Sequence, residues 1–100
     1  MNKYLNLLTI CKKAGKLATG FDPAKEAVDK GKAKLILLAS DLSSKTEKEI
    51  RFIAEKKAVT VMKTSLTLDE YYFGLGKKAG VFAVCDDGFA VSLSGLVSDK

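Results

Sequence analysis

Apolar residues recur along this chain in two patterns, one typical of helices and the other of strands. In residues 2–14 they repeat every three or four positions and would line one face of a helix. Residues 34–39 are almost continuously apolar between polar stretches, which is typical of a strand covered on both faces. The same patterns predict further strands and helices, with strands at residues 17–19, 59–62 and 81–85 and helices at 23–30, 44–57 and from 67 onward.

Strands that alternate with helices predict an α/β sandwich, in which helices cover both faces of a central sheet. One hundred residues are close to the commonest domain size, so we expect a single domain over residues 1–100. Two capping boxes strengthen the helix predictions, because Ser44 precedes Glu47 and Thr67 precedes Glu70 at the required spacing. Glu47 and Arg51 are also correctly ordered for an i,i+4 ion pair on the third helix.

The pattern after Gly88 fits two structures. Phe89, Val91 and Leu93 alternate as in a strand, and the Asp-Gly pair before them is a hairpin signal. Phe89, Leu93 and Leu96 also repeat as in a helix. The residues alone leave both alternatives open.

Few residues offer chemistry for catalysis or for binding a metal or cofactor. The chain has no histidine, which removes the commonest general base, and we expect Cys11 and Cys85 to be buried free thiols. The two aspartates of residues 86–88 have no third ligand nearby, so we interpret them as a tight surface turn. The sequence contains no P-loop and no nucleophile beside a base. We therefore expect that the protein is not an enzyme and that it binds no metal and no cofactor.

The apolar runs also bear on location. None approaches the ~20 residues of a membrane span, so we expect no membrane partner. Lysines occur throughout residues 1–20, which does not fit a secretory signal peptide. We therefore expect a cytoplasmic protein.

The net charge of +5 is concentrated in the first third of the chain. Residues 1–34 hold eight lysines and three acidic residues, whereas residues 35–100 hold nine basic and nine acidic residues. An excess placed in this way favours a polyanion as partner.

The most basic stretch leads into the second predicted helix. Lys12, Lys13 and Lys16 come before a turn bounded by glycines, and the helix would begin with Asp22 as N-cap and Pro23 in its first position. A helix N-terminus beside lysines is suited to bind a phosphate. The alternative is an ordinary solvated basic face, and the Asp22 carboxylate would compete with a phosphate for the same amides.

In their order and spacing, several short motifs resemble the ribosomal RNA-binding superfamily of the L-seven-Ae and L-thirty-e type, and more narrowly its bacterial YlxQ-like branch. The resemblance covers nearly the whole chain and is carried by KAGKL at residues 13–17, Gly20, AV at 27–28, Gly31, AKLILLASD at 33–41 and GFA at 88–90. It implies a three-layer α/β/α sandwich with a four-stranded mixed sheet, and it implies that the last segment is a helix.

The resemblance also implies a site. Members typically bind a kink-turn, a kinked internal loop of RNA, through a Gly-x-Asn-Glu-x-x-Lys motif at the start of the second helix. Gly20 matches its glycine, whereas Asp22, Pro23 and Glu26 stand where the family has Asn, Glu and Lys. Asp only accepts hydrogen bonds when ionised, Pro23 removes a carboxylate and Glu26 reverses a charge. These departures predict weak discrimination for a kink-turn.

The sequence is therefore interpreted as that of a non-catalytic, ribosome-associated protein that binds structured RNA. Phe21 is expected to pack ahead of the helix, with base stacking as the alternative. A second hypothesis is a protein-interaction adapter on the same fold, with ribosomal or other protein partners, because the aromatic cluster at residues 71–73 is typical of interfaces. The predicted RNA-binding residues are Lys12, Lys13, Lys16, Gly20, Phe21, Asp22, Lys25, Glu26, Lys77 and Lys78.

Overall fold

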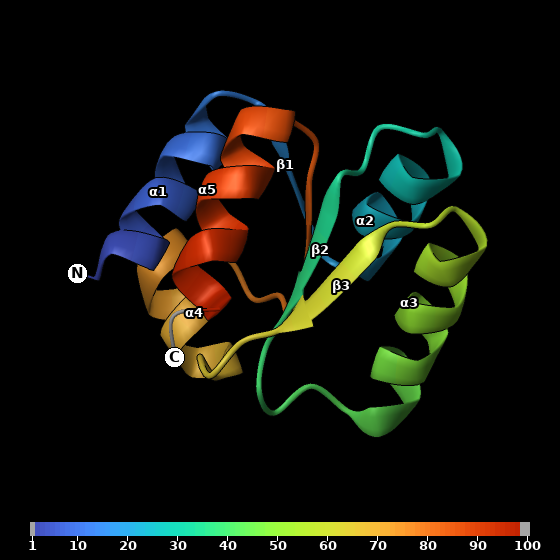
Figure 1. The fold of residues 1–100 in the computed structure, drawn as a ribbon. Coiled ribbons are helices and arrows are strands. Elements are labelled where there is room, and N and C mark those ends of the chain that lie inside the picture. The colour runs from blue at the N-terminus through green and yellow to red at the C-terminus, as the bar shows by residue number, and fades with distance from the viewer. Residues whose placement is uncertain (1, 99–100) are drawn as a thin grey trace.

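The computed structural model describes residues 2–98, which form three layers around one sheet (Figure 1). The sheet consists of β1 (Leu17–Thr19), β2 (Leu35–Leu38), β3 (Thr60–Lys63) and β4 (Val81–Val84). Their order is β1-β4-β2-β3; β2 is parallel to β3, and β4 is antiparallel to both of its neighbours. The sheet is therefore mixed, as the resemblance implied, and β1 and β2 run in the same direction.

Helices cover both faces of this sheet. On one face lie α1 (Lys3–Lys13), α4 (Leu68–Leu75) and α5 (Asp87–Ser98), and on the other lie α2 (Phe21–Asp29) and α3 (Ser44–Lys56) (Figure 1). β2 and β4 are buried along their whole length. Successive residues of β2 point into different cores, since Leu37 packs with α1, α4 and α5 and Ile36 with α2 and α3. The prediction of a strand covered on both faces is confirmed.

The last segment is a helix, α5, and the tight turn predicted at residues 86–88 is wrong. The Asp86 carboxylate accepts a hydrogen bond from the Phe89 amide (2.9 Å) and so satisfies one of the free amides at the start of α5. Leu93 is buried on the inner face of the helix, whereas Val91 is 73% exposed. A strand would place Phe89, Val91 and Leu93 on one face, so this difference in exposure fits the helical pattern only.

The cap predicted at Ser44 is also wrong by one residue. The hydroxyl of Ser43 is the N-cap of α3 and accepts from the amide three residues further on. Glu47 does not close a capping box, because its carboxylate accepts from Arg51 (2.9 Å) and from Lys63 (3.0 Å). The predicted pair with Arg51 is thus confirmed, and the added contact to Lys63 ties α3 to the edge strand β3.

α4 begins as predicted, with Thr67 and Glu70 forming a capping box. One turn later the Tyr71 hydroxyl lies in a buried network, 2.8 Å from the Tyr4 hydroxyl and 2.6 Å from the Thr64 hydroxyl. Burial is the main cause that raises the pKa of both tyrosines, so both remain neutral in the fold. The network joins α1 and α4 to the end of the sheet on which the candidate site lies.

Candidate nucleic-acid interface

The chain enters α2 through Gly20, whose backbone φ of 108° is readily adopted by glycine alone. The Gly20 amide donates to the Val81 carbonyl (2.8 Å), which holds the turn against the first residue of β4. The N-cap is therefore Gly20, and the prediction of Asp22 as cap was wrong: Asp22 and Pro23 are the second and third residues of the helix. Since no side chain of the described residues 2–98 caps α2, the amides of Phe21 and Asp22 are available to an anion.

The other predicted residues on α2 have different environments. Phe21 is the first residue of α2, so the prediction that it packs ahead of the helix was wrong. It is half-buried and packs against the core between the sheet and α2 and α3, which favours a packing role over base stacking. Asp22 and Lys25 are exposed. Glu26 is also exposed and pairs with Lys30 (3.2 Å), so part of its charge is compensated by a neighbour on the same helix.

Lys77 and Lys78 lie in the loop between α4 and β4, and both are exposed. Gly76 ends α4 in the left-handed conformation, with a φ of 73°. The Lys12 ammonium group donates to the carbonyl of Leu75, the last residue of α4, at 2.9 Å. Lys12 therefore supports the start of this loop, and its charge is half-buried behind the loop.

Gly80 closes the same loop at a crowded position. A Cβ atom on Gly80 would lie 2.5 Å from Cδ2 of Leu68, so the close approach of α4 favours glycine here and a larger residue would displace the leucine side chain. The Gly80 carbonyl accepts from the Ala39 amide (2.9 Å), which ties the loop to the end of β2. Because Gly20 is bonded to Val81, the residue after Gly80, the start of α2 and the Lys77–Lys78 loop lie at the same end of the sheet.

Lys13 is exposed in the last turn of α1, and Lys16 lies elsewhere. Lys16 precedes β1, and its carbonyl accepts from the amide of Cys85, at the far end of β4 (2.8 Å). The Lys34 amide donates to the neighbouring residue of β4, and Lys32 and Cys85 line one shallow groove of about 210 Å³. The structure therefore separates the predicted residues, because Lys16 belongs to a second basic cluster at the opposite end of the sheet from the start of α2.

The cysteines lie in different environments. Cys11 is buried as predicted, whereas Cys85 is only half-buried, contrary to the prediction. Burial raises the pKa of the Cys11 thiol to about 11 and also raises the pKa of Cys85, against the opposing effect of three nearby lysines. Both thiols are thus protonated at neutral pH, a form that is a poor nucleophile and metal ligand. Within residues 2–98, no group of three or more His, Cys, Asp or Glu side chains could hold a metal ion.

No helix in the described part of the chain is both long and apolar enough to cross a membrane.

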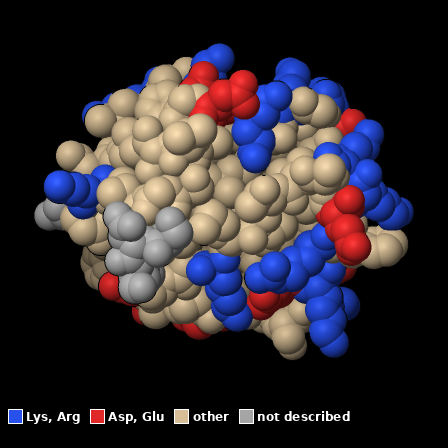
Figure 2. Space-filling model, in the orientation of Figure 1, with Lys and Arg blue, Asp and Glu red and all other residues tan. Residues whose placement is uncertain are grey.

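Sequence reasoning missed lysines that α3 brings to the same end of the sheet. β1 and β2 run in the same direction, so α3, which follows β2, begins where α2 begins. Lys45 and Lys48 lie in the first turns of α3, are exposed, and have no carboxylate partner within residues 2–98. Figure 2 shows that Lys and Arg gather on the side of α2 and α3 and along the lower edge, while the surface over α5 is largely uncharged. Sequence reasoning did not include the direction of β2 in the sheet, and this direction places the start of α3 at the end where α2 begins.

Comparisons with known proteins find a matching family, a similar relative and solved structures of the same fold. The matching family model is that of the ribosomal protein L7Ae/L30e/S12e/Gadd45 family, over residues 2–88. The chain is similar to the RNA-binding protein YlxQ of Enterococcus faecium, with 30% identity over 95 residues that cover 95% of this chain and 91% of that protein.

Two solved structures share the fold. A protein with unknown function from Bacillus halodurans superposes with a TM-score of 0.89 at 27% identity, covering 98% of this chain and 99% of the other. The 15.5kD RNA binding protein of Giardia lamblia superposes with a TM-score of 0.73 at 18% identity, covering 95% and 84% of the two chains. The second match is a likeness of fold.

Proposed function

This chain belongs to the ribosomal protein L7Ae/L30e/S12e/Gadd45 family, and from that premise we propose that it is a non-catalytic RNA-binding protein of the cytoplasm, associated with the ribosome. One observation carries the proposal: the uncapped start of α2 and the exposed Lys77–Lys78 loop meet at one end of the sheet. The relative from Enterococcus faecium, described as an RNA-binding protein, supports the same assignment.

The proposed interface binds mainly the phosphate backbone of the RNA. Lys77 and Lys78 contact phosphates, and the amides of Phe21 and Asp22 bind a further phosphate at the positive end of the helix dipole. Gly20 has no side chain, so the RNA can approach the backbone closely. Lys25 extends this surface along α2, while Lys12 supports the loop from behind. Phosphate contacts of this kind supply most of the affinity and little of the sequence selectivity.

Selectivity for a kink-turn is proposed to be weak. The Asp22 carboxylate accepts hydrogen bonds and cannot donate one to a base edge. Pro23 supplies neither an amide hydrogen nor a polar side chain. Glu26 places a negative charge one turn into the helix, and its partner Lys30 compensates it only partly, since exposed ion pairs are weak. The lysines and amides therefore dominate, and they bind a kinked and a straight RNA with similar strength.

Paired charge reversals test the site. We expect the double change Lys77→Glu and Lys78→Glu to weaken binding of a kink-turn RNA at least tenfold, because both side chains are exposed at the interface. The matched control reverses Lys32 and Lys34, which are equally exposed but lie at the opposite end of the sheet. Equal losses from the two doubles would mean that charge acts diffusely and that no defined site exists.

A protein-interaction adapter is the second candidate, and one observation favours it. Phe73 is 86% exposed on α4, and the neighbouring Tyr72 ring lies 6.3 Å away, so together they form an aromatic surface. An adapter requires protein partners whose binding is lost in Phe73→Asp and kept in the Lys77–Lys78 reversal. RNA binding that depends on Lys77 and Lys78 and is unaffected by Phe73→Asp decides against this candidate.

A further inference from the structure

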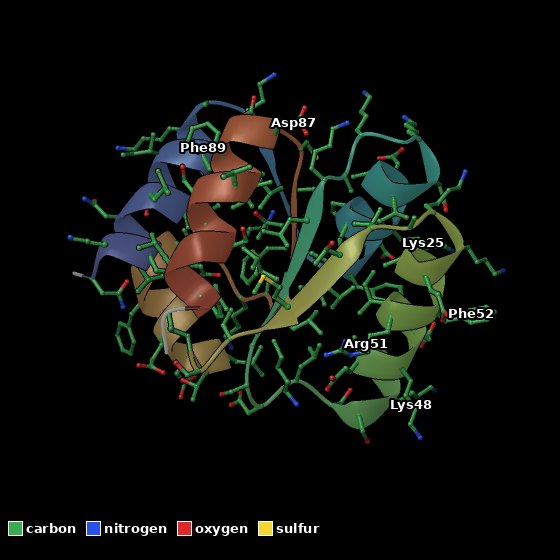
Figure 3. All side chains as sticks on the ribbon, in the orientation of Figure 1. Lys25, Lys48, Arg51, Phe52, Asp87 and Phe89 are labelled. Carbon is green, nitrogen blue, oxygen red and sulfur yellow. The ribbon has the colours of Figure 1, made fainter. Side chains whose placement is uncertain are left out.

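The outer face of α3 carries a basic stripe with an aromatic residue in its middle. At 3.6 residues per turn, residues 45, 48, 52 and 56 fall on one face of the helix. These are Lys45, Lys48, Phe52 and Lys56, and Phe52 is 60% exposed. Figure 3 shows Lys48 and Phe52 on the side of α3 that faces away from the sheet.

Among residues 2–98, no carboxylate pairs with the cations of this stripe. Glu47 binds Arg51 and Lys63, so those two cations belong to the contact between α3 and β3. Arg51 points from α3 toward the sheet, away from Phe52 (Figure 3). The Lys56 ammonium lies 4.4 Å from the centre of the Phe52 ring and covers part of it. An exposed phenyl ring held beside a lysine adds little to the core and is available to a partner.

The stripe fits single-stranded RNA better than a duplex. Lysines that track a phosphate backbone, with an aromatic ring on which a base stacks, are the two elements by which proteins hold single strands. The bases of a duplex are stacked on one another and cannot reach Phe52. Glu49 and Glu55 lie on either side of the stripe on the helix and limit the width of its positively charged surface. From Lys45 to Lys56 it is about 16 Å long at ~1.5 Å per residue, room for a few nucleotides of a single strand.

The position of α3 indicates which part of the RNA would supply the single-stranded segment. α3 begins at the same end of the sheet as α2 and the Lys77–Lys78 loop. Resting on the RNA-binding function proposed above, we propose that the stripe Lys45, Lys48, Phe52 and Lys56 binds a single-stranded segment that flanks the structured RNA. The natural ligand then has a structured part and an unpaired tail, and the two parts bind adjacent surfaces.

The test compares three RNAs: a kink-turn hairpin, and the same hairpin with six unpaired uridines added at its 5′ end or at its 3′ end. With the natural protein, we expect one of the two tails to tighten binding at least fivefold. The change Phe52→Leu should remove that gain and leave the affinity for the hairpin within twofold, and Lys45→Glu with Lys48→Glu should remove the gain as well. Phe52→Tyr keeps an aromatic ring and should keep the gain.

Phe73→Leu is the matched control, because it removes a more exposed aromatic ring from α4, in the opposite helix layer. A tail gain lost equally in Phe73→Leu and Phe52→Leu would overturn the proposal, as would a hairpin that binds while neither tail adds affinity. If the hairpin binds but neither tail adds affinity, the proposed function stands and only the inference about α3 fails. If neither the hairpin nor the tailed RNAs bind, both fail. A protein partner that requires Phe52, with no tail gain, would assign the stripe to protein binding and also overturn the proposal.

Discussion

Replacing Tyr71 by phenylalanine tests the buried network that joins α1 and α4 to the sheet. The Tyr71 side chain is fully buried, and its hydroxyl lies 2.8 Å from that of Tyr4 and 2.6 Å from that of Thr64. Thr64 retains a partner in the variant, because its hydroxyl donates to the Leu38 carbonyl (2.8 Å). Tyr4 is also buried and loses its partner.

A buried hydroxyl without a partner costs about 1–3 kcal/mol. We therefore expect Tyr71→Phe to lower the free energy of unfolding by roughly that amount. In a domain of this size, ~1 kcal/mol corresponds to a decrease in Tm of about 4–8 °C. Urea titration followed by circular dichroism measures the free energy, and a thermal melt measures Tm.

The neighbouring Tyr72→Phe is the control. Tyr72 is 44% exposed on the same helix, so removal of its hydroxyl should change the free energy of unfolding by less than about 0.5 kcal/mol. The double variant Tyr4→Phe with Tyr71→Phe leaves no orphaned hydroxyl from this pair, and its cost should be smaller than the sum of the two single costs. If Tyr71→Phe is as mild as Tyr72→Phe, the hydroxyl network does not contribute to stability and the reasoning is refuted.

Three further predictions concern Gly80, Glu47 and the start of α2. Gly80→Ala should destabilise the fold by roughly 1 kcal/mol, the lower end for overpacking, because the crowding leucine atoms are flexible side-chain ends; an unchanged midpoint in urea contradicts this. Hydrogen bonds from Lys63 and Arg51 lower the pKa of Glu47, so its contribution is present above the unfolded pKa of about 4.3 and is lost as the pH falls through the folded pKa. Glu47→Gln should therefore cost at most about 1 kcal/mol at pH 7 and nothing at acid pH; a cost that persists in acid excludes the ionised pair as cause. Changing Asp22, Pro23 and Glu26 to Asn, Glu and Lys should raise the preference for a kink-turn over a plain duplex roughly tenfold, since a good base contact adds about 1–3 kcal/mol; titration of both RNAs measures it, and a natural protein that is already selective refutes it.

Much of the fold could be predicted from sequence because local patterns determine it. Continuous apolar runs predicted β2 and β4, and the spacing of Thr67 and Glu70 predicted the start of α4. The helix after residue 88 needed the family resemblance, because Phe89 and Leu93 fit both periods. The start of α2 was mispredicted because Gly20 is fixed by Val81, a partner sixty-one residues away that no local signal contains.

The candidate site was predicted only in part, because its assembly depends on strand direction. The start of α2 and Lys78 were predicted together and do lie at one end of the sheet. Lys16 was grouped with them because it is near in sequence, yet β1 separates it from Gly20. Lys45 was missed because it reaches this end only through the direction of β2. Sequence proximity is therefore a poor guide wherever a strand lies between two charges.

The most direct test of RNA binding through a basic face is the salt dependence of affinity. A labelled kink-turn RNA is titrated with the natural protein and with the Lys77→Glu, Lys78→Glu double variant over a range of salt concentrations. The account predicts that log K falls linearly with log salt, by about 0.7–0.9 for each phosphate contacted, and that the variant has a slope shallower by roughly two contacts. An affinity that does not change with salt, or a variant with an unchanged slope, would contradict the account.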